Sequence, residues 1–445
     1  MEADVIVIGG GMAGAIAALR ASSLGANVIL IRKGHGSSAM SSGTIDIAGP
    51  TAFLPLDSWD SLPSIPDRLG EMLRTHALHP YSIVAGGRTG LGQVCYRLRQ
   101  ACDFLLDKVP GLQLDGSTAQ NLALPTILGT VKFTAFAPSS LAGGNLREMR
   151  DAHVLVVGVR GLMFFQPHVC KQSLERYSSL HAPSSIGRVE VVEADMPRLA
   201  SAAPATPFEA ARSFDDPLTV EKFAQSLANS LPSDATHIAV PPILGLNRHA
   251  ETYEIISREL RPKIFELISP TFSVPGHRLQ VELEAALQRN SVRVVTTDVV
   301  DAKRDGRIVR NLVLEDMKSK RTATAKSFII ATGKFSTGGL VANDFPKEPI
   351  FKLPLFVGGK RVDNGFVQDL LSWNVDGRQL FLSCGLHIDD SLRPLDTFGE
   401  PAYENLFAAG AVIGEYDYVT DKCGMGVAAL TGYLVGENAA TLAAR

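Results

Sequence analysis

Cysteine is sparse in this chain of 445 residues, and its five cysteines lie far apart. They stand at Cys95, Cys102, Cys170, Cys384 and Cys423, and no two have the C-x-x-C spacing typical of zinc sites and iron–sulfur clusters. We therefore expect neither a metal centre nor a cluster in this chain. An odd, scattered set of cysteines also fits a reducing cytoplasm better than a disulfide framework.

Strong charge of either sign and long hydrophobic runs are absent as well. The formal net charge is −3, so no global basic field exists and nucleic acid is not expected as a partner. The longest apolar stretch, residues 154–165, is broken by glycine and arginine and is shorter than the roughly 20 residues that span a membrane. The first residues lack the pattern of a secretory signal. We expect a cytoplasmic protein that reaches the inner face of the cytoplasmic membrane only through a partner.

The chain does have a glycine-rich turn near its beginning. The strand-forming run Val5–Ile8 is followed by Gly9, Gly11 and Gly14 in the pattern G-x-G-x-x-G, at the start of a predicted helix, Met12–Leu24. The first glycine permits a tight turn, the second lets the backbone approach a pyrophosphate, and the third allows the helix to pack on the strand. The helix N-terminus attracts phosphate. A dinucleotide is therefore predicted to bind here.

The identity of the dinucleotide stays open at this turn. A second predicted strand, Val28–Ile31, ends at Arg32, where Asp or Glu usually binds the hydroxyls of the adenosine ribose. A basic residue at this place fits a 2′-phosphate, and so NADP. It equally fits a cation beside a ribose that is held differently.

The C-terminal part of the sequence is similar to the second half of the FAD-binding domain of two-dinucleotide-fold flavoproteins. A predicted helix, Leu279–Gln288, precedes predicted strands at 292–296, 299–303, 308–314 and 328–331. The last strand ends in Thr332 and Gly333. A further strand at 406–409 leads to a turn at Gly410.

The final predicted helix, Met425–Ala440, begins after Cys423 and Gly424, with Gly426 in its first turn. In flavoproteins of this type such a helix points its N-terminus at the flavin, where reduction builds negative charge that the helix dipole stabilises. Cys423 would have a lowered thiol pKa if it were exposed there, or it is a small buried residue.

Together these segments predict an α/β protein with a Rossmann-like FAD-binding domain in split halves, residues 1–169 and 270–445. An inserted α+β cap or substrate domain is predicted at 170–269.

Four segments resemble, in this order, the B subunit of the anaerobic glycerol-3-phosphate dehydrogenase. They are VIVIGGGMAG (5–14) with the following ILIRKG, SSGTIDIAG (41–49), FIIATGKFSTGGLVA (328–342) and LFAAGAVIGEYDYVTDKCGMGV (406–427). The resemblance implies a flavoprotein related to the succinate dehydrogenase and fumarate reductase fold. It also implies a complex with a catalytic A subunit and an iron–sulfur C subunit, which oxidises sn-glycerol 3-phosphate to dihydroxyacetone phosphate and passes electrons towards quinone.

The resemblance also bears on the cofactor and its contacts. The B subunits of the family are usually assigned FMN, but the pyrophosphate-binding turn favours FAD, so FAD is the prediction and FMN the alternative. As in similar flavoproteins, Ser41, Ser42 and Gly43 are predicted to face the flavin diphosphate and ring, although serines also close turns in ordinary loops. Lys334 follows the A-T-G segment where a small residue is common, and so adds a cation near the cofactor.

Oxidation of a hydroxy compound by a flavin needs a base for the hydroxyl proton and a cation for the substrate phosphate. The candidates are two adjacent pairs, His277 with Arg278 and Arg248 with His249. Each of these residues can equally be structural.

Three functions remain open from the sequence. The first is a flavin-dependent dehydrogenase of a polyol phosphate or related hydroxy compound. The second is a non-catalytic flavin subunit that relays electrons from a catalytic partner to an iron–sulfur protein. The third is an NADP-binding protein, which Arg32 favours and the A-T-G and C-terminal segments oppose.

Overall fold

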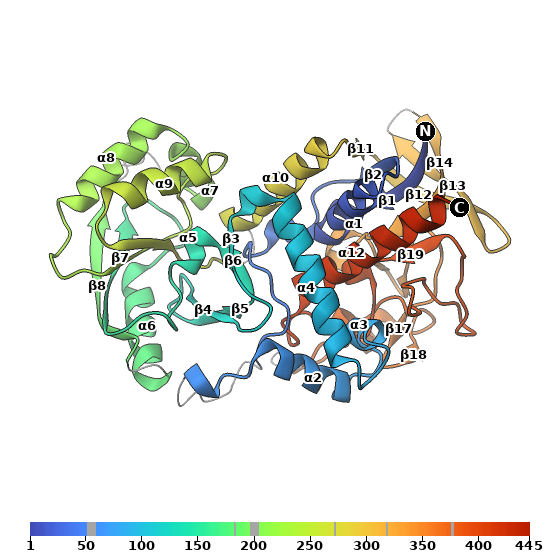
Figure 1. Cartoon of the computed structure of the whole chain (residues 1–445), viewed down its shortest axis with the longest axis horizontal. Helices are drawn as coiled ribbons and strands as arrows, with labels where there is room; N and C mark the ends of the chain where they lie inside the picture. The colour runs from blue at the N-terminus through green and yellow to red at the C-terminus, as the bar shows by residue number, and fades with distance from the viewer. Residues whose placement is uncertain (51–58, 182–183, 196–203, 271–272, 317–318, 375–377) are drawn as a thin grey trace.

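The computed structural model of the chain describes residues 1–50, 59–181, 184–195, 204–270, 273–316, 319–374 and 378–445. These residues form two lobes, each with a sheet of its own (Figure 1). The larger lobe, on the right of Figure 1, holds both termini, and the smaller lobe is built from the middle of the chain.

The larger sheet joins strands from the two ends of the sequence. Its order is β11-β2-β1-β14-β13-β12, with β19 paired to β14. The strands are β1 (Glu2–Ile8), β2 (Val28–Arg32), β11 (Arg293–Thr296), β12 (Asp298–Asp305), β13 (Ile308–Asp316), β14 (Ser319–Ile330) and β19 (Leu406–Ala408). N-terminal β1 pairs with C-terminal β14, and β2 pairs with β11. The predicted α/β domain in split halves is therefore confirmed.

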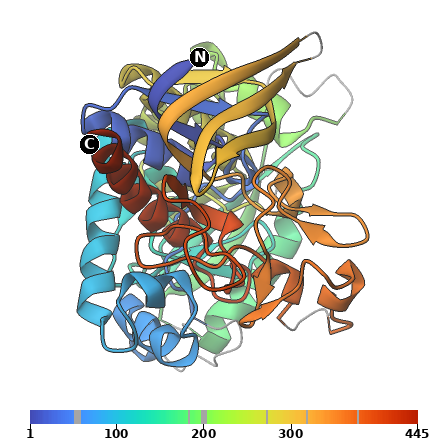
Figure 2. The same cartoon turned by 90° about the vertical axis from the view of Figure 1, so that its right-hand side faces the viewer.

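The strands of this sheet run parallel around β1, and β12 and β13 are antiparallel additions, seen as long ribbons below the N-terminus in Figure 2. Val5, Ile6 and Val7 of β1 are fully buried, as expected of a parallel strand covered on both faces. Parallel strands bring their carboxyl ends to one edge, and open α/β sheets bind their ligands at that edge. The ends of β1, β14 and β19 meet there.

Two helices of small residues pack against each other beside this sheet. They are α1 (Met12–Ser23) and α12 (Gly424–Ala443). A Cβ atom at Gly432 would lie 2.5 Å from the carbonyl oxygen of Ala13, and one at Gly436 would lie 2.6 Å from that of Ala17. Glycine therefore permits the close approach. Within the described ranges, no helix combines the length and the apolar character needed to cross a bilayer.

The smaller lobe has a parallel four-stranded sheet of order β10-β9-β7-β8. Its strands are β7 (Ala152–Val159), β8 (Ile186–Ala194), β9 (His237–Val240) and β10 (Lys263–Glu266). Its helices are α6 (Pro167–His181), α7 (Pro207–Ser213), α8 (Pro217–Ala228) and α9 (His249–Glu259). Antiparallel ribbons β3 (Leu114–Gly116) with β6 (Phe136–Pro138) and β4 (Leu122–Pro125) with β5 (Val131–Thr134) lie beside it. The lobe has its own core, in which Phe214 and Phe223 are fully buried.

The predicted boundary at residue 170 does not follow this architecture. β7 precedes residue 170 and yet lies in the middle of the smaller sheet, paired to both β8 and β9. All eight of its residues are buried, and a continuous apolar strand has the same sequence pattern in either parallel sheet. We therefore propose that the inserted lobe begins ahead of Ala152. After β10 the chain returns to the larger lobe through α10 (Val274–Arg289), close to the predicted second boundary at residue 270.

Candidate cofactor site

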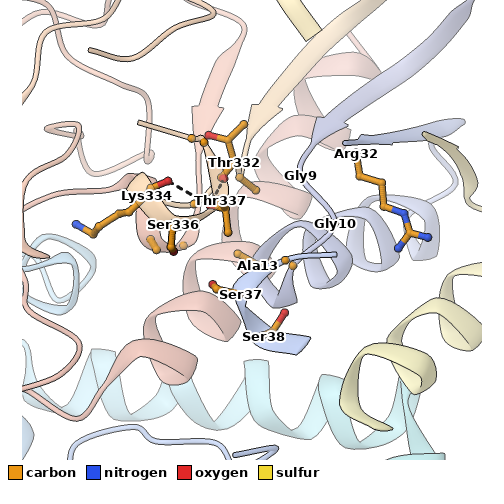
Figure 3. Close-up of a pocket in the computed structure, with 18 of the residues that line it drawn as sticks. Gly9, Gly10, Ala13, Arg32, Ser37, Ser38, Thr332, Lys334, Ser336 and Thr337 are labelled. Carbon is orange, nitrogen blue, oxygen red and sulfur yellow. Dashed lines mark hydrogen bonds between the residues drawn. The ribbon is translucent and has the colours of Figure 1, made fainter. Parts of the chain in front are cut away.

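A cavity of about 850 Å³ lies at the carboxyl edge of the larger sheet. Its lining includes the glycine turn after β1, the end of β2, the segment 36–41, residues 297–300 after β11, the segment 331–339 after β14 and the start of α12. Figure 3 shows the glycine turn, Arg32, Ser37, Ser38 and Thr332 around this space. The lining therefore comes from both halves of the sequence.

The glycine turn has the geometry that a diphosphate requires. Gly9 has a φ of +122°, and a Cβ atom there would lie 2.1 Å from the carbonyl oxygen of Ala331. Gly14 packs on the turn itself, since its Cβ would lie 2.0 Å from the carbonyl oxygen of Gly9. Gly11 is the N-cap of α1 and provides no side-chain cap. The Met12 amide donates to Ser38 Oγ, so the amides that follow it in the first turn are the ones that can meet phosphate oxygens.

Two hydroxyl groups of the lining lack partners. The Tyr416 hydroxyl and Thr332 Oγ1 are buried and have no hydrogen bond within the described part of the chain, and both residues line the cavity. A buried hydroxyl without a partner costs about 1–3 kcal/mol. A polar ligand in the cavity would supply the missing partners, so the lining fits a cofactor with many hydrogen-bonding groups.

Lys334 is one of the lining residues and carries a buried cation; its closeness to the cofactor stays a prediction. Its Nζ donates to the carbonyl oxygens of Cys384 at 2.7 Å and Ile413 at 3.3 Å, and lies 5.2 Å from the centre of the Tyr416 ring. Burial lowers the pKa of Lys334 from 10.5 to about 8, so most molecules carry the positive charge at pH 7. Such a charge favours a ligand that becomes negative on reduction.

Arg32 is not a free cation. Its guanidinium forms an ion pair with Glu284 of α10, and the Arg32 side chain is only 16% exposed. A 2′-phosphate would have to compete with this carboxylate for Arg32. The NADP interpretation of Arg32 therefore loses its main support.

Eight of the predicted cofactor-binding residues line the cavity: Gly9, Gly11, Arg32, Ser41, Thr332, Gly333, Gly410 and Gly424. Five others lie outside the described lining: Gly14, Ser42, Gly43, Cys423 and Gly426. The glycines of this second group allow close packing, since a Cβ at Gly43 would lie 2.8 Å from Pro275 and one at Gly426 would lie 2.4 Å from the Tyr81 hydroxyl. Contact between any of these residues and a cofactor stays a prediction.

The sequence reasoning missed several lining residues. They include Gly10, Ser38, Tyr416, Tyr418 and the segment 297–300. Ser38 belongs to no obvious motif, yet its Oγ accepts a hydrogen bond from the Met12 amide of α1 at 3.2 Å. The signal that could have found it is the serine-rich stretch from Ser37 to Ser42. The two tyrosines lie within the segment 406–427, but for them the sequence offered only the resemblance of that segment to the family.

Cys423 is buried, and burial raises the pKa of its thiol well above the usual range. The alternative of a small buried residue is therefore the correct one. Its Sγ lies 3.7 Å from His79 Nε2, and together with Asp421 they place three potential ligand atoms within 4.8 Å of one another. His79 Nδ1 accepts the Tyr81 amide at 3.0 Å, so the ring proton of a neutral His79 sits on Nε2 and points at the sulfur. This tautomer disfavours a metal ion at Nε2.

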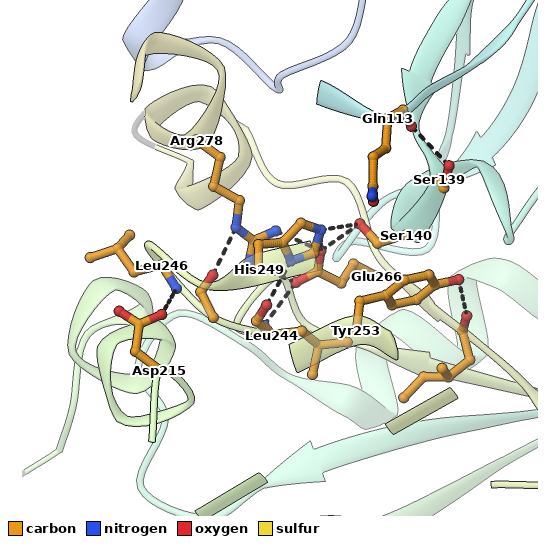
Figure 4. Close-up of polar contacts among 12 residues, drawn as sticks. Gln113, Ser139, Ser140, Asp215, Leu244, Leu246, His249, Tyr253, Glu266 and Arg278 are labelled. Atoms are coloured by element: carbon orange, nitrogen blue, oxygen red, sulfur yellow. Dashed lines mark hydrogen bonds and ion pairs between the residues drawn. The ribbon is translucent and has the colours of Figure 1, made fainter. Parts of the chain in front are cut away.

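Two of the predicted catalytic residues belong to a buried network at the junction of the lobes (Figure 4). Arg278 of α10 donates to both carboxylate oxygens of Glu266, at 2.7 and 3.1 Å. His249 places Nδ1 2.6 Å from the carbonyl oxygen of Leu244 and Nε2 3.0 Å from the Ser140 hydroxyl. Burial, followed by the charge of Arg278, lowers the pKa of His249 to about 4, so this imidazole is neutral at pH 7.

The other two predicted catalytic residues lie elsewhere. Arg248 forms an exposed ion pair with Glu251 at 2.5 Å, and the His277 ring packs edge-on against Phe208 with 5.7 Å between centres. Of these four candidates, none belongs to the described lining of the cavity. Their catalytic role stays a prediction that this geometry does not support, because the polar groups of Arg278, His249 and Arg248 already have protein partners.

Comparisons with known proteins agree with this site. The sequence matches the family described as "FAD binding domain" over residues 4–427. It is 31% identical to the probable B subunit of an anaerobic glycerol-3-phosphate dehydrogenase of Halobacterium salinarum, over 99% of this chain and 98% of the relative. It is 27% identical to the B subunit of the anaerobic glycerol-3-phosphate dehydrogenase of Actinobacillus pleuropneumoniae, over 98% and 99%.

Among solved structures, a 3-ketosteroid delta1-dehydrogenase from Sterolibacterium denitrificans covers 99% of both chains at 13% identity, with a TM-score of 0.43. The family match identifies the cofactor as FAD and the protein as a flavin-dependent oxidoreductase. On its similarity over nearly the whole sequence, the chain belongs to the B-subunit family of the anaerobic glycerol-3-phosphate dehydrogenases.

Proposed function

We propose that this protein takes part in the oxidation of sn-glycerol 3-phosphate to dihydroxyacetone phosphate, or of a related hydroxy compound to the corresponding carbonyl compound. The observation that carries the proposal is the cavity at the carboxyl edge of the sheet, which fits FAD. It lies in a chain that is similar, over nearly its whole length, to B subunits of anaerobic glycerol-3-phosphate dehydrogenases. FAD held in this cavity would supply a hydride acceptor for the carbon that bears the hydroxyl group, while the hydroxyl proton would leave to a base or to water. Lys334 would hold a positive charge beside the cavity while the flavin gains negative charge.

The electrons must then leave the flavin for another carrier. The five cysteines are free and separated, and the sequence spacing offers no iron–sulfur ligand set. We propose that an A-type flavoprotein and an iron–sulfur C-type protein are the partners and that the electrons pass through them to quinone. Any position on the inner face of the cytoplasmic membrane would depend on these partners.

A second candidate is a subunit that carries FAD and relays electrons without binding the substrate. The observation in its favour is the placement of the candidate catalytic residues, since Arg278, His249 and Arg248 are all engaged by other protein groups. This relay protein would hold oxidised FAD but would not react with glycerol 3-phosphate by itself.

The test begins with the visible spectrum of the purified protein. Heat release of the chromophore and chromatography against FAD and FMN identify the cofactor, and glycerol 3-phosphate is then added without oxygen. Bleaching of the flavin bands would support a dehydrogenase in its own right. Bands that bleach only when the A-type partner is added would support the relay. A protein that stays oxidised with both would overturn the substrate proposal.

A further inference from the structure

The adenosine end of the cavity carries a charge arrangement that the motif alone does not predict. In this fold the ribose of the adenosine half lies at the end of β2, next to an acidic side chain. Here Arg32 occupies that place, and its side chain lies over the glycine turn, with Cδ 2.7 Å from the position of a Cβ on Gly10. Arg32, Lys33 and His35 all line the cavity at this end.

An acidic side chain reaches the same place from another part of the chain. Glu284 lies on α10, which packs against α1, and its Oε1 accepts hydrogen bonds from Arg32 and from Gln280 Nε2 at 3.0 Å. His35 Nδ1 lies 3.1 Å from the same oxygen. The other oxygen, Oε2, receives no hydrogen bond from any residue that the structure describes.

Glu284 is also fixed relative to the diphosphate turn. Gln280, one helical turn before it, donates from the same Nε2 to the carbonyl oxygen of Gly10 at 3.1 Å. Gln280 is buried, and its Oε1 has no partner within the described ranges. Burial alone would raise the pKa of Glu284, but the hydrogen bonds from Arg32 and Gln280 and the charge of Arg32 outweigh it and lower the pKa. The carboxylate is therefore ionised at neutral pH. Glu284 is not itself one of the residues that line the cavity, but its carboxylate is held directly behind two that are, Arg32 and His35.

We propose that Glu284 takes the place of the missing acid at the end of β2 and accepts the hydroxyl groups of the adenosine ribose of FAD, with Arg32 as the positioning residue that holds it. A carboxylate with one unoccupied oxygen can accept a ribose hydroxyl and repels a 2′-phosphate. In this arrangement Arg32 stands where the acid usually lies, and the acid itself, Glu284, comes from α10. The site would therefore favour FAD over FMN and over an NADP-type nucleotide. This inference rests on the FAD assignment and not on the proposed substrate.

The decisive experiment compares FAD with an FAD analogue that lacks the 2′-hydroxyl of the adenosine ribose. The full-length chain is stripped of flavin, and the affinity for each is measured by quenching of flavin fluorescence. The wild-type protein should bind the analogue roughly tenfold or more weakly, as expected for loss of a hydrogen bond to a charged group. In Glu284→Gln the affinity for FAD should fall by roughly ten- to a hundredfold, and the difference between the two flavins should shrink.

Glu282→Gln is the matched control, because it makes the same change on the same helix at a side chain that lies next to Gly111 instead of Arg32. It should leave both affinities within about twofold of the wild type. Because both ligands are measured on the same variant, a general loss of structure would weaken both and would not change the ratio of the two affinities. An unchanged ratio in Glu284→Gln, or no preference in the wild type, would overturn the proposal.

Arg32→Met tests whether Arg32 only positions Glu284 or also binds the nucleotide itself. If Arg32 only positions Glu284, this substitution should weaken FAD in the wild-type background and add little in the Glu284→Gln background. A further tenfold loss in the double variant would show that Arg32 binds the nucleotide itself and would refute the positioning role. As a second readout, 2′-phospho-ADP-ribose should compete with FAD better in Glu284→Gln than in the wild type.

Discussion

The FAD cavity and the polar network between the lobes both contain buried polar side chains, but only the network pairs them with one another. In the cavity, the Tyr416 hydroxyl and Thr332 Oγ1 have no partner within the described residues. In the network, Glu266 is 1% exposed, yet its carboxylate accepts from Arg278, from the Ser140 hydroxyl at 2.9 Å and from the Leu244 amide at 2.9 Å. A buried polar group without a partner can receive its hydrogen bond from a ligand, whereas polar groups that pair with one another stabilise the folded protein.

The network also joins two parts of the fold. Arg278 comes from α10 of the larger lobe, while Glu266 ends β10 of the smaller lobe. Burial alone would raise the pKa of Glu266, but the charge of Arg278 and the hydrogen bonds from Arg278 and from the Leu244 amide lower it. The carboxylate is thus ionised because Arg278 is present, and the pair fixes how the lobes meet.

The largest effect is expected from Arg278→Met. The substitution leaves the Glu266 carboxylate buried without its guanidinium, which should lower the free energy of unfolding by about 3–5 kcal/mol. Urea denaturation measures this loss, and the affinity for FAD of the folded variant should stay within about threefold of the wild type. A variant of normal stability with strongly weakened FAD binding would make the network part of the ligand site and remove the contrast.

Lys334→Met should change how stability depends on pH. The folded protein lowers the pKa of Lys334 from 10.5 to about 8, so between these values the unfolded chain binds more protons and stability rises with pH. The free energy of unfolding of the flavin-free wild type should therefore rise by about 3 kcal/mol relative to that of the variant as the pH is raised from 8 to 10.5. Parallel pH profiles of the two proteins in thermal denaturation would contradict a Lys334 cation whose pKa is lowered by burial.

The sequence predicted the parts of the site that depend on neighbouring residues. The strand, the glycine turn and α1 follow one another directly, so Gly9 and Gly11 could be placed without a structure. Contacts between distant residues could not be predicted, because no local pattern records them. Glu284 meets Arg32 across 252 positions. Arg278 and Glu266 are close in sequence, but they belong to different lobes, and no local pattern shows that their side chains meet.

The same reasoning explains the candidate catalytic residues. His249 and Arg278 were chosen for their chemistry, and chemistry alone does not tell whether a side chain will find a protein partner. Of the two serines predicted to face the flavin, Ser41 lines the cavity, whereas Ser42 lies outside the lining and its hydroxyl is hydrogen-bonded to that of Thr44 at 2.9 Å.

Tyr416→Phe sharpens the comparison from the side of the cavity. Removal of an unpaired buried hydroxyl should leave the flavin-free protein as stable as the wild type, or more stable by about 1 kcal/mol. If FAD supplies the missing partner, the affinity should fall by roughly fivefold or more, since a typical hydrogen bond contributes about 1 kcal/mol. If the flavin-free variant were less stable than the flavin-free wild type and its affinity for FAD were unchanged, the Tyr416 hydroxyl would have a structural role like the paired groups of the network.

The smallest effect is expected from Arg248→Met, the matched control for Arg278→Met. Arg248 is also an arginine paired with a glutamate, but its partner Glu251 is about half exposed, so water replaces the lost contact. The free energy of unfolding should change by no more than about 0.5 kcal/mol. Glycerol 3-phosphate turnover, measured with the partner proteins present, should also be unchanged. A loss of turnover at normal stability would make Arg248 a catalytic candidate again. Because Arg248 is not among the described residues that line the cavity, it would also mean that the two lobes close around the substrate and bring Arg248 to the cavity.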